Sequence, residues 1–177
     1  REFFQKNPPA RTIMPVQCIV VPDGRIEITL VALRKDARTK KEVISTQQAP
    51  APLFHESQAI RAGEILFLSG LLAADEKGIV PQAKLNPHYP YGANRSGVQM
   101  EAIMQHAQAI CAAAGTDLRH ALRLRTMHTD LREYAHAIGA RRARFPDGQP
   151  ATTTIQVPGP LAVPECSIAM DLWVGYP

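Results

Sequence analysis

Hydrophobic and polar residues alternate along several stretches of the chain, and a period of two predicts β-strands. The clearest stretch is RIEITLVAL at residues 25–33, in which Ile26, Ile28 and Leu30 share one face. A Pro-Asp-Gly turn precedes it, and residues 10–17 predict another strand before that turn. The chain therefore opens on two predicted strands with very little sequence ahead of them.

A second set of elements follows residues 34–41, a charged and aperiodic stretch that is typical of a linker. Apolar residues recur at steps of three and four over residues 96–114, which predicts a helix whose capping box is Ser96 with Gln99. The other predicted elements are strands at 42–48 and 65–73, a strand at 120–128 with Leu122 and Leu124 facing inward, a helix from 130 to about 145, and strands at 151–157 and 166–174. The order β-β-α-β-α-β-β predicts an α+β fold with two helices on one face of a mixed sheet.

The first two predicted strands resemble the last two at a nearly constant spacing. PARTIMPV begins at Pro9 and PATTTIQV at Pro150, 141 positions later (150 − 9). The following Val-Pro pairs begin at Val21 and Val163, 142 positions apart (163 − 21). One gap reconciles the two offsets, so the pattern indicates internal repetition on the scale of a domain. A chance similarity of two β-rich ends is the alternative.

The repeat divides the chain into a fragment and a complete unit. Residues 1–33 are interpreted as the last strands of a preceding domain, residues 34–41 as a linker, and residues 42–177 as a complete domain. On this spacing about a hundred residues would precede Arg1 (42 − 141 = −99). Two strands alone are marginally stable in water. We therefore expect residues 1–33 to be completed by a preceding segment, by another chain or by the second domain.

Composition and charge narrow the classes of function. The net charge is +4, and the densest basic cluster, residues 141–145, is interpreted as a solvated helix end rather than a nucleic-acid site. Three widely spaced cysteines suit a reducing compartment, which predicts a cytoplasmic protein. No apolar run reaches the length of a membrane span. None of the six histidines forms a close metal-ligand pair, so no metal site is predicted.

Several further motifs occur in a fixed order along the chain: AGEILFLSGLLAAD at 62–75, AAAG at 112–115, TDL at 129–131, FPDGQPATTTIQV at 145–157 and the final strand. Together they resemble the YjgF/Rid family of reactive-intermediate deaminases. The resemblance covers residue 50 to the end, with a second partial match over residues 1–33. It implies a chorismate-mutase-like α+β fold and a trimer with ligand clefts between subunits. It also implies hydrolysis of enamines and imines such as 2-aminoacrylate, without a metal or an organic cofactor.

The resemblance also implies roles for particular residues. In the family, the arginine of a PAR motif binds the substrate carboxylate, and it corresponds to Arg11 in the first repeat and Thr152 in the second. A glutamate of the last strand orients the water, and it corresponds to Glu27 in the first repeat. The second repeat has Ala169 there, with Asp171 two residues further along the same strand face.

The Ser-Gly pair that lines the family cleft is Ser69 with Gly70 in the second unit. Arg11, Ser69, Gly70 and Thr152 are thus the candidate substrate-binding residues, and Glu27 is the candidate catalytic residue. The physical chemistry agrees, because a guanidinium can bind a carboxylate through two hydrogen bonds and a carboxylate can take a proton from an attacking water.

Two functions remain open on this evidence. The first is a deaminase acting on a small imine or enamine acid, with its site at domain interfaces around Arg11 and Glu27. The second is a non-catalytic binding or assembly domain, which Thr152 and Ala169 favour for the second unit. Tyr89 and Tyr91, in a loop rich in proline and asparagine, are candidates to close over a cleft, although a trimer contact or an ordinary surface loop is the favoured interpretation.

Overall fold

A six-strand path with one short additional strand forms the sheet at the centre of the computed structural model, which describes residues 3–34, 36, 38–86, 88 and 94–177. The strand order is β1-β2-β3-β9-β7-β8, and β4 pairs with β9. The strands are β1 (Lys41–Ile44), β2 (Ala59–Ala62), β3 (Ile65–Leu68), β4 (Leu71–Leu72), β7 (Ala121–His128), β8 (Ala151–Gln156) and β9 (Ile168–Gly175). Only β7 and β8 run parallel, so the sheet is mixed, as predicted.

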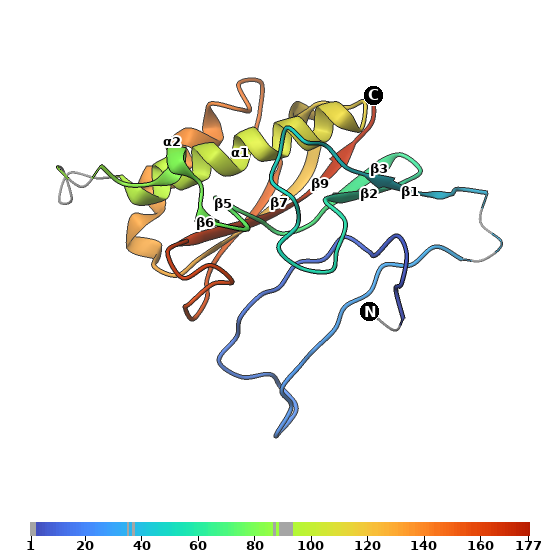
Figure 1. Cartoon of the computed structure of the whole chain (residues 1–177), viewed down its shortest axis with the longest axis horizontal. Coiled ribbons are helices and arrows are strands. Elements are labelled where there is room, and N and C mark those ends of the chain that lie inside the picture. Colours follow the sequence, from blue (N-terminus) through green and yellow to red (C-terminus); the bar gives the residue numbers. More distant parts are fainter. Residues whose placement is uncertain (1–2, 35, 37, 87, 89–93) are drawn as a thin grey trace.

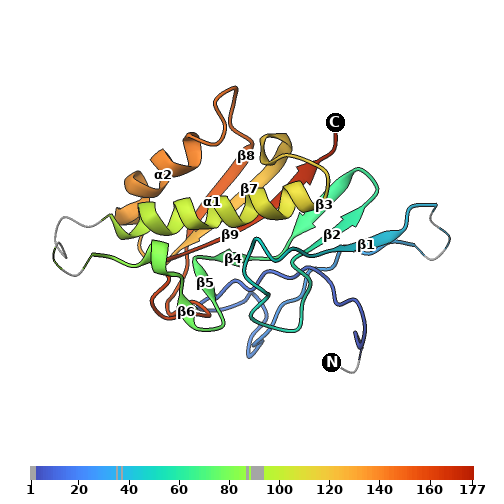
Figure 2. The same cartoon turned by 45° about the horizontal axis from the view of Figure 1, so that its top comes forward.

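Two helices, α1 (Arg95–Ala113) and α2 (Tyr134–Arg142), lie on the same side of this sheet (Figures 1 and 2). A small hairpin of β5 (Ala74–Asp75) and β6 (Gly78–Ile79) lies between β4 and α1 in the sequence. Short 3₁₀ turns occur at Pro81–Ala83, Leu118–His120 and Leu131–Glu133. The arrangement is the predicted α+β layer, with the sheet on one side and the helices on the other.

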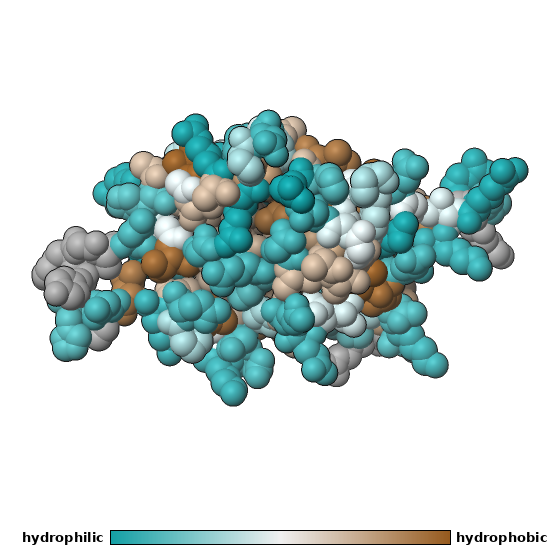
Figure 3. All heavy atoms as spheres, turned by 90° about the horizontal axis from the view of Figure 1, so that it is seen from above, coloured by the Kyte–Doolittle hydropathy of each residue, from teal (hydrophilic) through white to brown (hydrophobic). Residues whose placement is uncertain are grey.

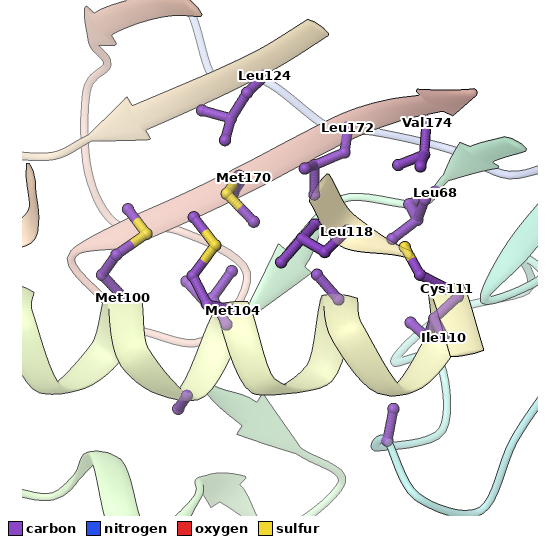
Figure 4. Packing of buried hydrophobic residues seen from close by; sticks show 14 of the residues in the cluster. Leu68, Met100, Met104, Ile110, Cys111, Leu118, Leu124, Met170, Leu172 and Val174 are labelled. Atoms are coloured by element: carbon purple, nitrogen blue, oxygen red, sulfur yellow. The ribbon is translucent and has the colours of Figure 1, made fainter. Parts of the chain in front are cut away.

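The core fills the space between α1 and the centre of the sheet (Figure 4). Met100, Met104 and Ile110 of α1 point toward β9, whose Met170 and Leu172 point back toward the helix. These side chains are at most 1% exposed. Successive residues of a strand face opposite sides, so alternate residues of β9 pack against the helix. This explains why the apolar period of two in residues 166–174 predicted a strand correctly.

The N-terminus of α1 differs from the predicted capping box. Asn94 is the N-cap, and its side-chain oxygen accepts a hydrogen bond from the Gly97 amide. Ser96 instead donates to the Glu133 carbonyl, and Gln99 accepts from the amide and hydroxyl of Ser167. These two side chains are fully buried because they join the helix to neighbouring segments.

A break in strand register explains a wrong prediction for β7. Leu124 is fully buried as predicted, but Leu122 is 53% exposed. The pairing of β7 with β9 shifts between Ala121 and Arg123, so Leu122 falls out of the alternation. The basic cluster at residues 141–145 lies at the C-terminal end of α2, as predicted, and Arg142 is exposed. Arg141 differs from the prediction, because it is 5% exposed rather than solvated.

The N-terminal segment, residues 3–34, contains no assigned strand, so the predicted strands at 10–17 and 25–33 do not form within this chain. The segment makes a long excursion on the side of the sheet away from the helices (Figure 1). Ile26, Ile28 and Leu30 are 73–78% exposed. The alternation is present in the sequence, but no strand among the described residues pairs with residues 25–33.

The outer surface over the helices is mainly hydrophilic, with small hydrophobic groups between polar ones (Figure 3). The apolar residues of α1 that belong to the core face the sheet, and Ser96, Gln99 and His106 are buried polar residues of the same helix. No helix within the described ranges is long and apolar enough to cross a membrane.

Candidate active site

One short stretch of the N-terminal segment, residues 8–12, is held against the sheet by backbone hydrogen bonds. The Ser57 amide donates to the Pro9 carbonyl over 3.1 Å, and the Ser57 hydroxyl donates to the Pro8 carbonyl over 2.6 Å. The Gly70 amide donates to the Arg11 carbonyl over 3.0 Å. The stretch therefore lies beside the chain just before β2 and just after β3, and this contact fixes the backbone of Arg11.

Ser69 connects these segments. Its hydroxyl donates to the Ser57 carbonyl over 2.6 Å and accepts from the Arg11 amide over 2.9 Å. Ser69 is 3% exposed. Because the single hydroxyl proton is committed to the Ser57 carbonyl, Ser69 orders the backbone around Arg11 and is not arranged as a nucleophile.

Gly70 permits the close approach of the N-terminal stretch. A Cβ atom at Gly70 would lie 3.3 Å from Thr12 Cγ2 and 3.4 Å from Thr12 Cα. These distances are tighter than ordinary van der Waals contact, so a side chain at this position would push the stretch outward. The absence of a side chain at Gly70 is therefore part of how Arg11 reaches its position.

The Arg11 side chain makes two contacts. Its Nε donates to Glu56 Oε2 over 2.9 Å, and its guanidinium carbon lies 5.2 Å from the centre of the Phe54 ring. The Arg11 side chain is 43% exposed, whereas the Glu56 side chain is 7% exposed. Neither Nη1 nor Nη2 of Arg11 has a partner in the part of the chain that the structure describes. Glu56 thus orients the guanidinium while the edge formed by the two Nη atoms stays available.

A cavity opens beside this ion pair. Its polar lining consists of Arg11, Glu56, Gln58, Ser69 and His106. The larger apolar residues that line it are Ile13, Leu53, Phe54, Leu71, Leu72, Ile110 and Leu161. The N-terminal segment, the loop before β2, the end of β3, α1 and the loop before β9 all contribute to it. The cavity is therefore an apolar space with one cation and one carboxylate on its wall.

Gln58 shapes the loop that forms one side of the cavity. Its Oε1 accepts from the Thr46 amide over 2.6 Å, and its Nε2 donates to the carbonyls of Thr46, Ala49 and Pro50. Gln58 is 6% exposed. A buried amide that is satisfied in this way fixes a loop without offering its hydrogen bonds to a ligand.

Burial changes the ionisation of two cavity residues. It raises the pKa of Glu56 above its usual value of 4.5, although the hydrogen bond and the charge of Arg11 act in the opposite direction. Burial lowers the pKa of His106 below 6.5, against the raising effects of the Leu72 backbone and Asp75. His106 is therefore held as neutral imidazole near pH 7, and Arg11 and Glu56 are the charged groups of the cavity.

The structure brings together three of the five predicted site residues. Arg11, Ser69 and Gly70 line the same cavity, whereas Glu27 and Thr152 are exposed and lie outside its lining. Thr152 on β8 donates its hydroxyl proton to the Pro150 carbonyl. Tyr89 and Tyr91 lie outside the residues that the structure describes.

Residues at the positions of the family glutamate have separate environments. Ala169 lines the cavity but carries no charge. Asp171 is 4% exposed at its side chain and lies outside the cavity lining, where its Oδ2 accepts from Arg125 and its Oδ1 lies 3.5 Å from Arg123. Asp171 is committed to these arginines, so it does not replace the missing glutamate of β9 in the cavity.

Two cavity residues, Glu56 and His106, were not predicted from the sequence. Glu56 stands in the irregular stretch before β2, where no period marks a face, and its partner Arg11 is 45 positions away. His106 lies on the buried face of α1, four positions before Ile110, and this spacing was a usable signal. In the described part of the chain, no group of three or more histidine, cysteine, aspartate or glutamate side chains is arranged to hold a metal ion.

Comparison with known proteins identifies relatives over most of the chain. The family profile described as Endoribonuclease L-PSP matches residues 46–162. A chloroplastic protein of Arabidopsis thaliana, Reactive Intermediate Deaminase A, is 32% identical over 118 residues, which are 67% of this chain. The same match spans 58% of the plant protein, less than two thirds of its length. A RutC family protein of Sinorhizobium fredii is 32% identical over 116 residues, 66% of this chain and 84% of that protein.

Solved structures show the same fold. RidA from the Antarctic bacterium Psychrobacter sp. matches with a TM-score of 0.61 and 24% identity over 76% of this chain and 98% of its own. Yeast Mmf1 matches with a TM-score of 0.64 and 17% identity over 78% of this chain and 100% of its own. At these identities the likeness concerns the fold alone, and it confirms the predicted α+β architecture.

Proposed function

The chain belongs to the Endoribonuclease L-PSP family, and on this premise we propose that it is a hydrolytic deaminase of a small imine or enamine acid. The position of the Arg11 side chain is the observation that most directly supports this proposal. Its guanidinium stands on the wall of an apolar cavity, and the edge formed by Nη1 and Nη2 is directed by the hydrogen bond from Nε to Glu56. A planar guanidinium edge matches a carboxylate through two parallel hydrogen bonds.

The reaction that suits such a cavity is the addition of water to a carbon–nitrogen double bond. An iminium carbon is already electrophilic, so the protein needs to bind the acid, position a water and transfer protons. Arg11 would hold the carboxylate, and Ser69 with Gly70 would hold Arg11 in place. The name of the plant relative, Reactive Intermediate Deaminase A, supports the same class of reaction.

The exposed part of the N-terminal segment is a proposed contact surface. Ile26, Ile28 and Leu30 are largely exposed, and Glu27 lies among them. We propose that another chain, in a trimer or a related assembly, or a segment preceding Arg1 covers these residues. Glu27 would then orient water in the site that this contact completes, in line with its interpretation as part of a repeat.

A non-catalytic binding domain is the alternative, and specific residues favour it. Thr152 and Ala169 provide no charge at the two positions that match the family's arginine and glutamate. In that case the cavity would bind a small carboxylate through Arg11 without turning it over.

The test is the hydrolysis of 2-iminopropionate, generated in the assay from alanine by an amino acid oxidase. Competition with semicarbazide measures how fast the imine is converted to pyruvate. The wild-type protein is expected to accelerate this conversion, and Arg11→Ala is expected to lower kcat/KM on the order of 100-fold, because truncating one partner of a hydrogen-bonded charge pair has effects of this size.

Arg132→Ala is the matched control. Arg132 also pairs with a carboxylate, that of Asp130, but it is on the surface and outside the cavity lining. It is expected to leave the rate unchanged. A wild-type protein that does not accelerate imine hydrolysis overturns the deaminase proposal, and carboxylate binding without turnover supports the alternative.

A further inference from the structure

We propose that Glu56 recognises the nitrogen of the substrate and carries the proton between the attacking water and the departing ammonia. The cavity would then select zwitterionic ligands, which carry a cationic nitrogen and a carboxylate on the same carbon. The catalytic half of this inference rests on the proposed function, whereas the recognition half concerns binding and is testable without turnover.

The ion pair presents opposite charges side by side. Glu56 Oε2 accepts from Arg11 Nε, and Oε1 makes no hydrogen bond to any residue in the described ranges. The guanidinium likewise keeps its Nη edge for a ligand. An α-imino acid has its carboxylate and its iminium nitrogen on one carbon. Its two opposite charges therefore lie side by side, as the charges of Arg11 and Glu56 do on the cavity wall. The carboxylate would bind the Nη edge while the nitrogen donates to Oε1.

Glu56 is the only carboxylate among the described residues that line this cavity. The β9 position that matches the family glutamate is occupied by Ala169, which faces the cavity without an ionisable group. Ser69 has committed its proton to Ser57, and Gln58 has committed its amide to the loop before β2. Two ionisable side chains of the cavity remain for proton transfer, Glu56 and the neutral imidazole of His106. We assign the step to Glu56, because Arg11 lies beside it and its Oε1 makes no hydrogen bond within the described ranges.

The Glu56 side chain is buried, so the lack of a hydrogen bond at its Oε1 within the described ranges affects the free energy of its charged form. A buried charge with incomplete pairing is costly, and a cationic partner offsets that cost. Arg11 supplies one hydrogen bond to a side chain that is 7% exposed. An iminium or ammonium nitrogen at Oε1 would supply the second. A keto acid of the same shape carries the carboxylate but has a carbonyl oxygen in place of the cationic nitrogen. It offers no proton to Oε1, so the cavity should bind it less tightly.

The proposed step balances in atoms and charge. The oxygen of water bonds to the iminium carbon, the π electrons of the C=N bond move to nitrogen, and one water proton passes to Glu56. This gives a neutral carbinolamine and a protonated Glu56. Glu56 then returns the proton to the amine nitrogen. The C–N bond breaks as the C=O bond forms, and the remaining hydroxyl proton leaves with ammonia, giving the keto acid and ammonium.

Binding tests the recognition half. Calorimetric titration with alanine and with pyruvate compares a ligand that has a cationic nitrogen with one that lacks it. The wild-type protein is expected to bind alanine at least about tenfold more tightly, a difference of about 1.4 kcal/mol. Glu56→Gln keeps an acceptor for Arg11 but removes the charge, and is expected to bring the ratio of the two Kd values near one. Arg11→Ala is expected to weaken both ligands.

Glu101→Gln is the matched control, because Glu101 also pairs with an arginine, Arg144, outside this cavity. It should leave the ratio of the two Kd values unchanged. An unchanged ratio in Glu56→Gln overturns the recognition half, even if the protein hydrolyses imines.

Kinetics test the catalytic half. In the wild-type protein, kcat is expected to fall at acid pH as Glu56 becomes protonated, with a pKa above the ordinary 4.5. Glu56→Gln should lower kcat on the order of 100-fold and remove this acid limb, with an unchanged urea midpoint showing that the variant is folded. If Glu56→Gln keeps the wild-type kcat and pH profile, the proton-transfer role is overturned. If the wild-type protein has no activity at all, the proposed function itself fails, and the ratio of the two Kd values still decides the recognition half.

Discussion

Two stretches with nearly the same pattern have opposite environments in this molecule. Residues 25–33 alternate as residues 166–174 do, yet Ile26, Ile28 and Leu30 are 73–78% exposed, whereas Ile168, Met170 and Leu172 of β9 are fully buried. The difference lies in the neighbours, because β9 pairs with β3, β4 and β7 and is covered by α1. Alternation thus indicates which residues can share a face, but pairing with other strands decides whether a strand forms.

The two stretches that begin with Pro-Ala, residues 9–16 and 150–157, differ in the opposite sense. Residues 150–157 include β8, where Thr152 is exposed and bonds only within its own turn. Residues 9–16 form no assigned strand, but they place Arg11 on the cavity wall. The stretch that lacks regular structure carries the charge, and the stretch that has it carries none. Regular structure and candidate chemistry therefore belong to different stretches of this chain.

The largest expected effect compares matched side chains in the two stretches. Leu172→Ala should reduce the free energy of unfolding by about 2–5 kcal/mol, because it leaves a cavity in the core between β9 and α1. Ile28→Ala should change it by less than about 0.5 kcal/mol, because Ile28 is largely exposed. Urea denaturation followed by circular dichroism measures both.

The same two variants, measured at several protein concentrations, also test whether residues 25–33 are packed in solution. If Ile28→Ala is as destabilising as Leu172→Ala, residues 25–33 are packed in solution and the comparison between the stretches breaks. A destabilisation that grows with protein concentration would indicate that another copy of the chain covers them.

The fold was predictable from sequence where a periodic pattern coincided with burial. Residues 121–128, 151–156 and 168–175 are strands close to the predicted ranges, and residues 95–113 form the predicted helix. Three features were not predictable in this way. The four residues of β2 were too short for a periodic signal, the register shift beside Leu122 depends on pairing with β9, and Asn94 replaced Ser96 as the cap because Ser96 bonds to a distant carbonyl.

The candidate site was predictable only where a motif marked it. Arg11, Ser69 and Gly70 followed from a family pattern, and they lie together in the structure. Glu56 had no such mark, because its significance depends on a partner in another segment and on its burial. The raised pKa of Glu56 is likewise a property of the folded chain, in which desolvation outweighs the effect of Arg11.

A smaller effect is expected where the two regions touch. Gly70→Ala places a methyl group 3.3 Å from Thr12 Cγ2, so residues 8–12 must shift by a few tenths of an ångström. We expect this to raise KM by roughly two- to fivefold, about 0.4–1 kcal/mol of lost binding, while the core stays intact. Hydrogen exchange at the amides of Arg11 and Gly70 measures the loosening, since both donate across this contact.

Gly139→Ala is the matched control within the folded unit. Gly139 lies inside α2, and a Cβ there would meet no atom within 4 Å. This substitution should raise the free energy of unfolding by about 0.5–1 kcal/mol, because alanine favours a helix over glycine, and should leave KM unchanged. Faster exchange at Arg11 in Gly139→Ala would contradict a separation between core stability and the docking of residues 8–12.

The smallest expected effect compares two histidines, one in the folded unit and one beside the N-terminal segment. His128 of β7 is 1% exposed, and neither ring nitrogen has a hydrogen-bond partner among the described residues. Burial lowers the pKa of His128, the charge of Arg141 lowers it further, and Glu133 acts in the opposite direction. Tyr134 packs edge-on against the ring, with 5.7 Å between ring centres.

The direction of the pH effect follows from proton binding. Below the ordinary pKa of about 6.5, the unfolded chain binds a proton at His128 that the folded protein still excludes, so the free energy of unfolding falls as the pH falls from 7 toward the lowered pKa. His128→Gln should reduce this dependence without removing it, because the pKa of His106 is lowered as well. His55→Gln should change the free energy of unfolding by less than about 0.5 kcal/mol, because His55 is exposed and its Nε2 is hydrogen-bonded to the Phe4 carbonyl over 2.5 Å. Urea midpoints between pH 7.5 and 5.5 measure the dependence. If the urea midpoints of the two variants changed equally, the contact of His55 with the N-terminal segment would contribute to stability as much as the buried unit does. The comparison of residues 25–33 with residues 166–174 argues against that outcome.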